Sequence, residues 1–112
     1  MSTTPKVTIE KINALIDGEY YFTAEQGVQA AFGEQDELTR LTGAHGELRY
    51  LTFCVLRLKS GFTVTGESAC LSPENFSAKT GREVARKNAI DKIWALEGYR
   101  IKSELHQVAG HA

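Results

Sequence analysis

Two β-prone runs that flank the tripeptide Lys59-Ser60-Gly61 constrain the fold of this chain more than any other feature. The first run is Tyr50 to Leu58 and the second is Phe62 to Leu71. A three-residue loop would place all the strongly apolar pairs on one face of a hairpin, whereas a two-residue loop would scatter them. The predicted pairs are Leu58 with Phe62, Leu56 with Val64 and Cys54 with Gly66. Gly61 would then take the positive-φ position that such loops require.

The two faces of this predicted hairpin differ in character. The apolar face carries Cys54, Leu56, Leu58, Phe62 and Val64. The opposite face is half polar, with Arg57, Thr63, Thr65 and Glu67 beside Phe53 and Val55, so it is either solvated or part of an interface. The ladder separates the two cysteines, Cys54 and Cys70, by roughly 13 Å at the usual strand rise. A disulfide between them is therefore not expected.

One long amphipathic helix is predicted from Ser77 to Glu97, with Ser77 or Ser72 as its cap. At about 100° per residue, its apolar positions form one stripe. The stripe consists of Ala85, Ala89, Ile93 and Leu96, with Ile90 and Trp94 at its shoulder. Gly98 is expected to end this helix, and Tyr99 to Val108 is expected to add a short C-terminal helix.

Arg82 and Arg86 project into the same apolar stripe. Charged side chains are almost never fully buried without a partner, so a negative group must meet them there. Glu67 points to the other face of the hairpin, which leaves Glu97 as the only obvious carboxylate within the chain, about three turns from Arg86. This favours a partner from outside the chain, either another subunit or a bound anion.

The N-terminal part predicts a helix over Val7 to Ile16, with Thr8 as N-cap and Asp17-Gly18 as its stop. Tyr20 to Thr23 favours a short strand because it is aromatic and β-prone. The segment from Thr23 to Gln26 has the pattern of a capping box, which predicts a second helix through Ala31.

Together these elements predict an α+β fold: an antiparallel sheet built on the hairpin, packed against the long helix, with an N-terminal helix. At 112 residues, the chain is expected to form a single domain spanning residues 1–112. Residues 33–46 are acidic and then glycine-rich, which predicts a mobile surface loop. Residues 109–112 are expected to fray.

Composition and motifs argue against several function classes. The net charge of −1 provides no general attraction to nucleic acid or anionic lipid. The segment from Gly66 to Cys70 lacks the final glycine of a nucleophile elbow, and no His, Cys or carboxylate cluster has metal-ligand spacing. We therefore expect no enzyme, no metal and no cofactor. No apolar run approaches the ~20 residues needed to cross a bilayer, and the polar start lacks a signal-peptide pattern, so a cytoplasmic protein is expected.

A cationic and aromatic set of residues remains as the candidate ligand-binding site. Arginine presents a planar donor fork suited to phosphate, and an aromatic ring offers a stacking surface for a base. The set comprises Arg82, Arg86, Asn75, Phe76, Phe62, Asn88 and Arg57. The structural alternative is that Arg82 and Arg86 pair with Glu67, Glu97 or carboxylates of another subunit.

Four ordered motifs between Leu51 and Tyr99 carry a family resemblance: GFTVTGESAC, SPENF, GREVARKNA and KIWALEGY. This stretch, nearly half the chain, resembles a family of small tailed-phage and prophage proteins of unknown role. Ala95 stands where many members have proline. That family is in turn similar to the phage Thoeris anti-defence proteins of the first type, which are oligomeric and sequester cyclic nucleotide signals without cleaving them. The residues matching the shared pattern are Phe62, Asn75, Phe76, Arg82, Arg86 and Asn88.

The resemblance implies a non-enzymatic, phage-encoded protein of the host cytoplasm that sequesters a phosphate-bearing cyclic nucleotide immune signal and so counters host defence. The alternative is a small phage protein that modulates a host protein through a protein–protein interface. Nucleic-acid binding is disfavoured by the net charge. The helix and hairpin leave apolar residues uncovered (Tyr20 to Phe22, Trp94 and Tyr99), which predicts a homodimer or a higher oligomer.

Overall fold

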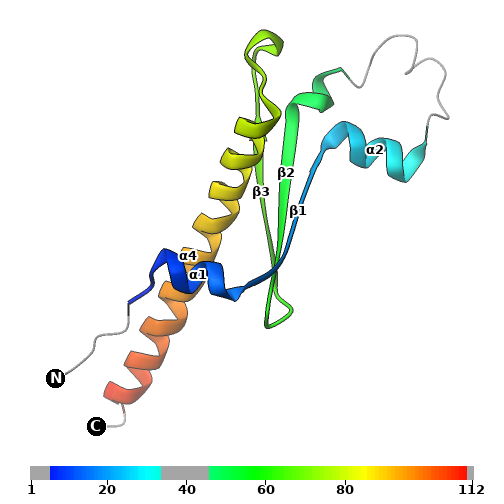
Figure 1. Ribbon diagram of the computed structural model, residues 1–112. Coiled ribbons are helices and arrows are strands. Elements are labelled where there is room, and N and C mark those ends of the chain that lie inside the picture. The colour runs from blue at the N-terminus through cyan, green and yellow to red at the C-terminus, as the bar shows by residue number, and fades with distance from the viewer. Residues whose placement is uncertain (1–5, 34–45, 111–112) are drawn as a thin grey trace.

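A three-stranded antiparallel sheet and one long helix form the body of the computed structural model, which describes residues 6–33 and 46–110 (Figure 1). The strands are β1 (Ile16–Thr23), β2 (Leu51–Leu58) and β3 (Thr63–Ala69), with β2 in the middle. The helices are α1 (Ile9–Leu15), α2 (Ala24–Phe32) and α4 (Ala78–Gly110), and two 3-10 turns are η1 (Glu47–Tyr50) and η2 (Pro73–Asn75). The predicted α+β class is confirmed.

β2 and β3 pair in the register that a three-residue loop predicts. The pairs include Leu56 with Val64 and Cys54 with Gly66, and the Leu58 N–H donates to the Phe62 carbonyl at 2.8 Å. Gly61 has a φ of 92°, a region that glycine enters without strain. Phe62, expected on the buried face, is 56% exposed because it lies in the loop just before β3.

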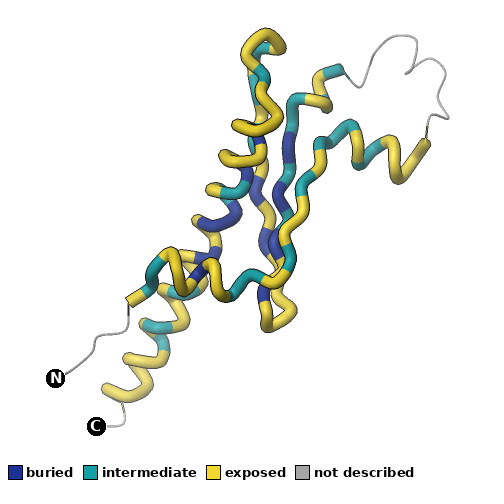
Figure 2. Tube along the Cα trace, in the orientation of Figure 1, coloured by how far each residue is buried: buried dark blue, intermediate teal, exposed yellow. Residues whose placement is uncertain are grey.

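The core lies between one face of the sheet and α4 (Figure 2). Its buried residues are Ile12, Cys54, Leu56, Leu58, Val64, Ala85, Ala89, Ile90 and Ile93. The helix approaches the sheet most closely at Gly66, where an added Cβ would lie 2.1 Å from the Ala85 carbonyl oxygen and 2.4 Å from the Ala89 nitrogen. Only glycine at this position lets the backbones of β3 and α4 come so close.

α1 ends at Leu15, one residue before the predicted end at Ile16, and β1 begins directly at Ile16, so Asp17-Gly18 lies within the strand. Thr8 caps the start of α1 as predicted, because its Oγ1 accepts the Lys11 N–H at 3.2 Å. The chain then joins the sheet, where Ile16 pairs with Leu58 and a register shift absorbs Asp17. Pairing with β2 has therefore replaced the turn that Asp-Gly favours when it stands alone.

α2 begins with the predicted capping box. The Gln26 N–H donates to Thr23 Oγ1 at 3.2 Å, and the Thr23 N–H donates to Gln26 Oε1 at 2.9 Å. Apart from Gly33 and Gly46, the expected loop over residues 33–46 lies outside the described residues.

α4 continues through Gly98 to Gly110, so the expected helix end at Gly98 and a separate helix over Tyr99 to Val108 are both wrong. Glycine inside a helix costs only about 1 kcal/mol relative to alanine. Arg100 bonds to Glu97 at 2.6 Å and to Glu104 at 2.8 Å, which supports the turns around the glycine. Beyond Ile93 the helix departs from the core, so Leu96 and Trp94 remain partly exposed.

Replacing Gly66 with alanine is expected to lower the free energy of unfolding by about 3 kcal/mol, because backbone atoms of α4 occupy the space of the new methyl group. Gly98→Ala is the matched control, since nothing lies within 4 Å of a Cβ there. It should stabilise the protein by about 0.5–1 kcal/mol. Urea unfolding followed by circular dichroism measures both, and equal stabilities would contradict the close packing.

Candidate functional site

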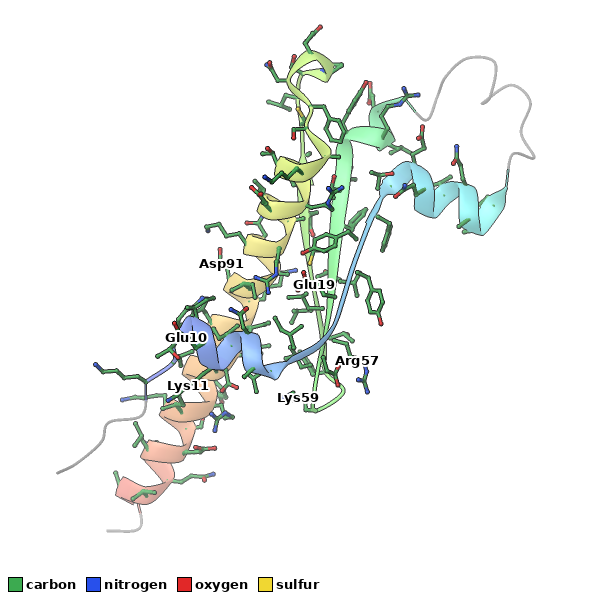
Figure 3. All side chains as sticks on the ribbon, in the orientation of Figure 1. Glu10, Lys11, Glu19, Arg57, Lys59 and Asp91 are labelled. Carbon is green, nitrogen blue, oxygen red and sulfur yellow. The ribbon has the colours of Figure 1, made fainter. Side chains whose placement is uncertain are left out.

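The seven predicted ligand residues lie at separate places on the fold. Asn75, Phe76 and Arg82 surround the start of α4, and Arg86 follows one turn later. Asn88 reaches the β3 edge, Phe62 lies in the hairpin loop, and Arg57 projects from the face of β2 opposite α4 (Figure 3). One ligand bound to a single chain therefore cannot contact the whole set.

A small pocket of about 170 Å³ lies where the end of β3, η2 and the first turns of α4 meet. Its polar and aromatic lining is Tyr50, Ser68, Asn75, Phe76, Ser77 and Thr80. The Phe76 ring packs edge-on against Tyr50, with ring centroids 5.2 Å apart. The pocket thus combines hydroxyl, amide and aromatic groups, and no charged residue of the described chain belongs to its lining.

The first turn of α4 points its backbone N–H groups toward this end of the helix. Ser77 Oγ accepts the Thr80 N–H at 3.3 Å, which confirms Ser77 as the cap. The Ser77 carbonyl accepts the Gly81 N–H at 2.8 Å. Unpaired N–H groups at the start of a long helix carry partial positive charge, so this end favours an anion.

Gly81 brings α4 into contact with the sheet beside the pocket. An added Cβ there would lie 2.9 Å from Thr52 Oγ1. Thr52 is 3% exposed, and its hydroxyl has no hydrogen-bond partner within the described residues. A buried polar group without a partner lowers the free energy of unfolding by roughly 1–3 kcal/mol. The close packing of the helix start on Thr52 therefore carries this cost.

Arg82 directly follows Gly81 and is exposed. Within residues 6–33 and 46–110, its guanidinium forms no ion pair and no side-chain hydrogen bond. It is therefore available to a ligand at the start of α4.

Arg86 is paired inside the chain, contrary to the expectation that its partner comes from outside. Its Nε donates to Glu19 Oε1 at 3.0 Å and its NH2 group donates to Asn13 Oδ1 at 3.0 Å. The Tyr21 hydroxyl donates to the other carboxylate oxygen of Glu19 at 2.7 Å. Glu97, the expected carboxylate, instead binds Arg100 at 2.6 Å. The network joins α1, β1 and α4, and Figure 3 shows Glu19 between β1 and the helix.

The network sets the protonation of its members. Partial burial raises the pKa of Glu19, but hydrogen bonds from Tyr21 and Arg86 and the charge of Arg86 outweigh it, so the net pKa is lowered. Burial and the bond to Glu19 raise the pKa of the Tyr21 hydroxyl. Burial likewise raises the pKa of the adjacent Cys54 thiol. Glu19 is thus ionised, whereas Tyr21 and Cys54 keep their protons and are poor nucleophiles.

The remaining predicted residues have structural partners or lie elsewhere. Asn88 Nδ2 donates to the Glu67 carbonyl at 2.8 Å, which ties α4 to β3. Arg57 binds both carboxylate oxygens of Asp17 at 2.8 Å on the face of the sheet that α4 does not cover.

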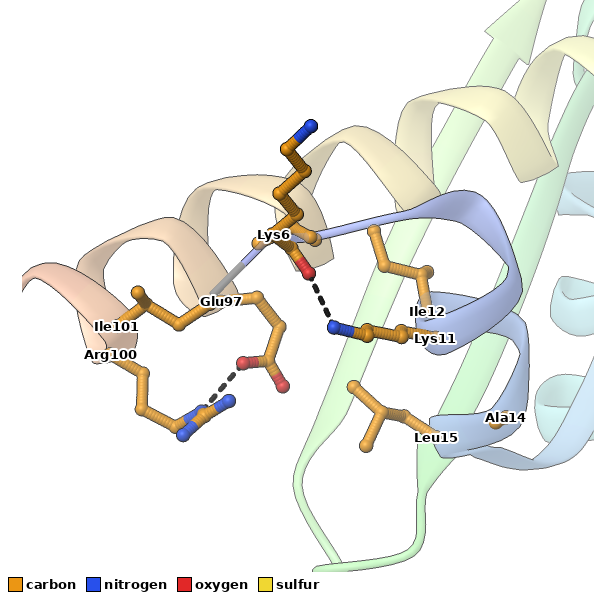
Figure 4. A pocket seen from close by; sticks show the side chains of 9 residues that line it. Lys6, Lys11, Ile12, Ala14, Leu15, Glu97, Arg100 and Ile101 are labelled. Carbon is orange, nitrogen blue, oxygen red and sulfur yellow. Dashed lines mark hydrogen bonds and ion pairs between the residues drawn. The ribbon is translucent and has the colours of Figure 1, made fainter. Parts of the chain in front are cut away.

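A second hollow, of about 290 Å³, lies between α1 and the C-terminal half of α4 (Figure 4). Its lining is mostly aliphatic and includes Val7, Ile12, Leu15 and Ile101. The polar groups at its rim already have partners, because Glu97 binds Arg100 and Lys11 Nζ donates to the Lys6 carbonyl at 2.8 Å.

No group of three or more His, Cys, Asp or Glu residues could hold a metal ion in the part of the chain that the structure describes. In the same residues, no helix has the length and apolar character to cross a membrane.

Sequence reasoning missed Glu19, Asn13 and Tyr21, which make up the network around Arg86. The alternation of side chains along β1 carried the signal, since Glu19 and Tyr21 lie two residues apart and share one face of the strand. The alternation identifies the partners of Arg86 only when the pairing of β1 with β2 is known, because that pairing places Glu19 opposite Leu56 and Tyr21 opposite Cys54.

Comparison with known proteins identifies one family. The model of the phage protein (N4 Gp49/phage Sf6 gene 66) family matches residues 7–105. Searches of curated proteins and of solved structures gave no match.

Glu19→Gln is expected to lower the free energy of unfolding by roughly 1 kcal/mol at neutral pH, because it removes the charge that Arg86 faces. The pKa of Glu19 is lowered in the folded protein, so its contribution is present above the ordinary carboxyl pKa. It is lost as pH falls through the folded value, so the two proteins should converge only once the pH lies below the lowered pKa of Glu19. Glu83→Gln, at an exposed position of α4, is the control. A pH-independent difference would contradict the ion pair.

Proposed function

Because the chain belongs to this family of phage proteins, we propose that it is a non-enzymatic binding protein for a phosphate-bearing nucleotide ligand. The observation that carries the proposal is the pocket at the start of α4, whose lining brings Asn75 and Phe76 beside the first turn of the helix, with Arg82 next in sequence after the lining residue Gly81. These three residues lie within one short segment, and each supplies a different kind of contact.

In this proposal, Arg82 and the backbone N–H groups of the first turn of α4 bind the phosphate. An exposed arginine without a counter-ion among the described residues can give two parallel hydrogen bonds to phosphate oxygens. The helix N-terminus adds favourable partial charge at the same end. Arg86 is assigned a supporting role, because its guanidinium is already held by Glu19 and Asn13.

Phe76 and Asn75 contact the base. Phe76 is half-buried against Tyr50 and offers one edge of an aromatic pair to the pocket. An asparagine amide both donates and accepts, so Asn75 can bond to the polar edge of a base. At about 170 Å³ the pocket is small, and much of a nucleotide would lie over Arg82 outside it.

The biological role that follows is sequestration of a cyclic nucleotide immune signal of the host, in support of phage replication. The resemblance to the Thoeris anti-defence proteins of the first type supports this role. Binding without cleavage suits the pocket, because its lining contains no charged group that could act as acid or base.

Calorimetric titration with a panel of cyclic nucleotides tests the proposal. At least one member should bind, and Arg82→Ala should weaken its affinity by one to two orders of magnitude, the loss of about 1.5–3 kcal/mol of charge-assisted hydrogen bonding. The bound nucleotide should be recovered intact by mass spectrometry after the complex is denatured.

Arg100→Ala is the matched control, because it removes an arginine from the same helix about 27 Å away along its axis. It should leave the affinity unchanged. The absence of heat for every member of the panel, or equal affinity of the Arg82→Ala variant, would overturn the proposed function.

A protein–protein role is the second candidate, favoured by the face of the sheet that α4 does not cover. Phe22 and Phe53 pack there with ring centroids 5.5 Å apart, and the neighbouring Tyr20 is 62% exposed. A host protein retained in stoichiometric amount, with retention lost in Phe53→Ser and kept in Arg82→Ala, would favour this candidate over nucleotide binding.

A further inference from the structure

β3 is an outer strand of the sheet in the part of the chain that the structure describes, and a groove runs along its free edge. The groove has a volume of about 650 Å³ and lies between β3 and α4. Its lining includes Phe62, Thr63 and Thr65 on the hairpin side and Lys92, Leu96 and Tyr99 on the helix side.

The edge of β3 offers backbone hydrogen bonds to this groove. The Leu58 N–H donates to the Phe62 carbonyl, and the Cys70 N–H donates to the Tyr50 carbonyl. The backbone N–H and C=O groups of the even-numbered residues in the second hairpin arm therefore point toward β2. In an antiparallel ladder, the odd-numbered residues then direct their N–H and C=O groups outward. The outward carbonyl of Glu67 is taken by Asn88 at 2.8 Å, whereas Thr63 and Thr65 lie beyond its reach.

The side chains along the groove are uncharged except for one cation, Lys92. Tyr99 is 77% exposed and Leu96 is 43% exposed, although both lie beside the exposed Phe62. Lys92 forms no ion pair within residues 6–33 and 46–110, and neither Asn88 nor Leu96, one turn away on α4, is acidic. No carboxylate of the described chain lines the groove.

We propose that this groove binds an extended segment of a partner protein, which adds to the edge of β3 as a fourth strand and places an acidic side chain beside Lys92. Strand addition gains affinity from backbone hydrogen bonds and specificity from pockets for alternate side chains. Side chains two residues apart in the added strand share one face. The acidic residue is therefore followed or preceded, two positions away, by an apolar residue that packs against Leu96 and Tyr99.

A second copy of β3 does not fit these requirements. Its residues on the helix side, Val64 and Gly66, are buried under their own α4, and its Glu67 lies on the opposite face of the sheet. A copy of β3 therefore offers neither an acidic group to Lys92 nor an apolar side chain to Tyr99. A single cation in an otherwise uncharged groove is also too little charge for nucleic acid.

Selection from a random peptide library provides the probe. Peptides enriched on the immobilised protein should contain an extended, β-prone run with Asp or Glu two positions from an apolar residue. Selection on Lys92→Glu should replace that acid with Lys or Arg, whereas selection on Lys102→Glu, elsewhere on the same helix, should keep it. Enrichment of the same peptides on Lys92→Glu would overturn the proposal.

Amide hydrogen exchange with a synthetic copy of an enriched peptide tests the strand itself. At about ten times the dissociation constant, exchange at Thr63 and Thr65 should slow about tenfold. Thr65→Pro should abolish binding and keep the fold, since an edge strand tolerates proline where the N–H points outward. Unchanged binding by Thr65→Pro, unchanged exchange, or protection that rises with protein concentration alone would each overturn the proposal, the last in favour of a second copy.

Discussion

The contact between Gly66 of β3 and the α4 backbone at Ala85 and Ala89 is the constraint on which the rest of this structure depends. Because these residues are small, the helix lies directly on β3 and β2 and leaves β1 largely uncovered. The gap above β1 is where Arg86 reaches Glu19. Close packing of α4 over β3 thus leaves space over β1, on the same face of the sheet, for a polar network.

The sequence predicted those parts of the fold that local rules determine. The register of the hairpin followed from the position of its apolar residues and the glycine in its loop, and the pairs Leu56–Val64 and Cys54–Gly66 are present. Thr8 and Thr23 cap α1 and α2 because a hydroxyl can bond to an N–H three residues ahead. Each of these features involves residues close together in the chain or a periodicity of two.

The parts that could not be predicted depend on contacts between distant residues. Glu19 and Arg86 are 67 positions apart, and their meeting requires β1 to pair with β2 while α4 packs on β3. Gly98 would end an isolated helix, but the Glu97–Arg100–Glu104 ion pairs span it. For the candidate site, the sequence placed Asn75, Phe76 and Arg82 together because they are neighbours, and it could not separate them from Phe62 and Arg57.

Charge pairing distinguishes the cations that maintain the fold from those available to a ligand. Arg86, Arg57 and Arg100 each bind a carboxylate of the chain at 3.0 Å or less. Arg82 and Lys92 have no such partner among the described residues. Arg82 follows Gly81, which lines the pocket at the start of α4, and Lys92 lines the groove beside β3; neither described lining contains a carboxylate. A net charge of −1 therefore conceals two local sites of positive charge on α4. One lies at a helix N-terminus, which suits phosphate, and the other lies beside a free strand edge, which suits an acidic peptide.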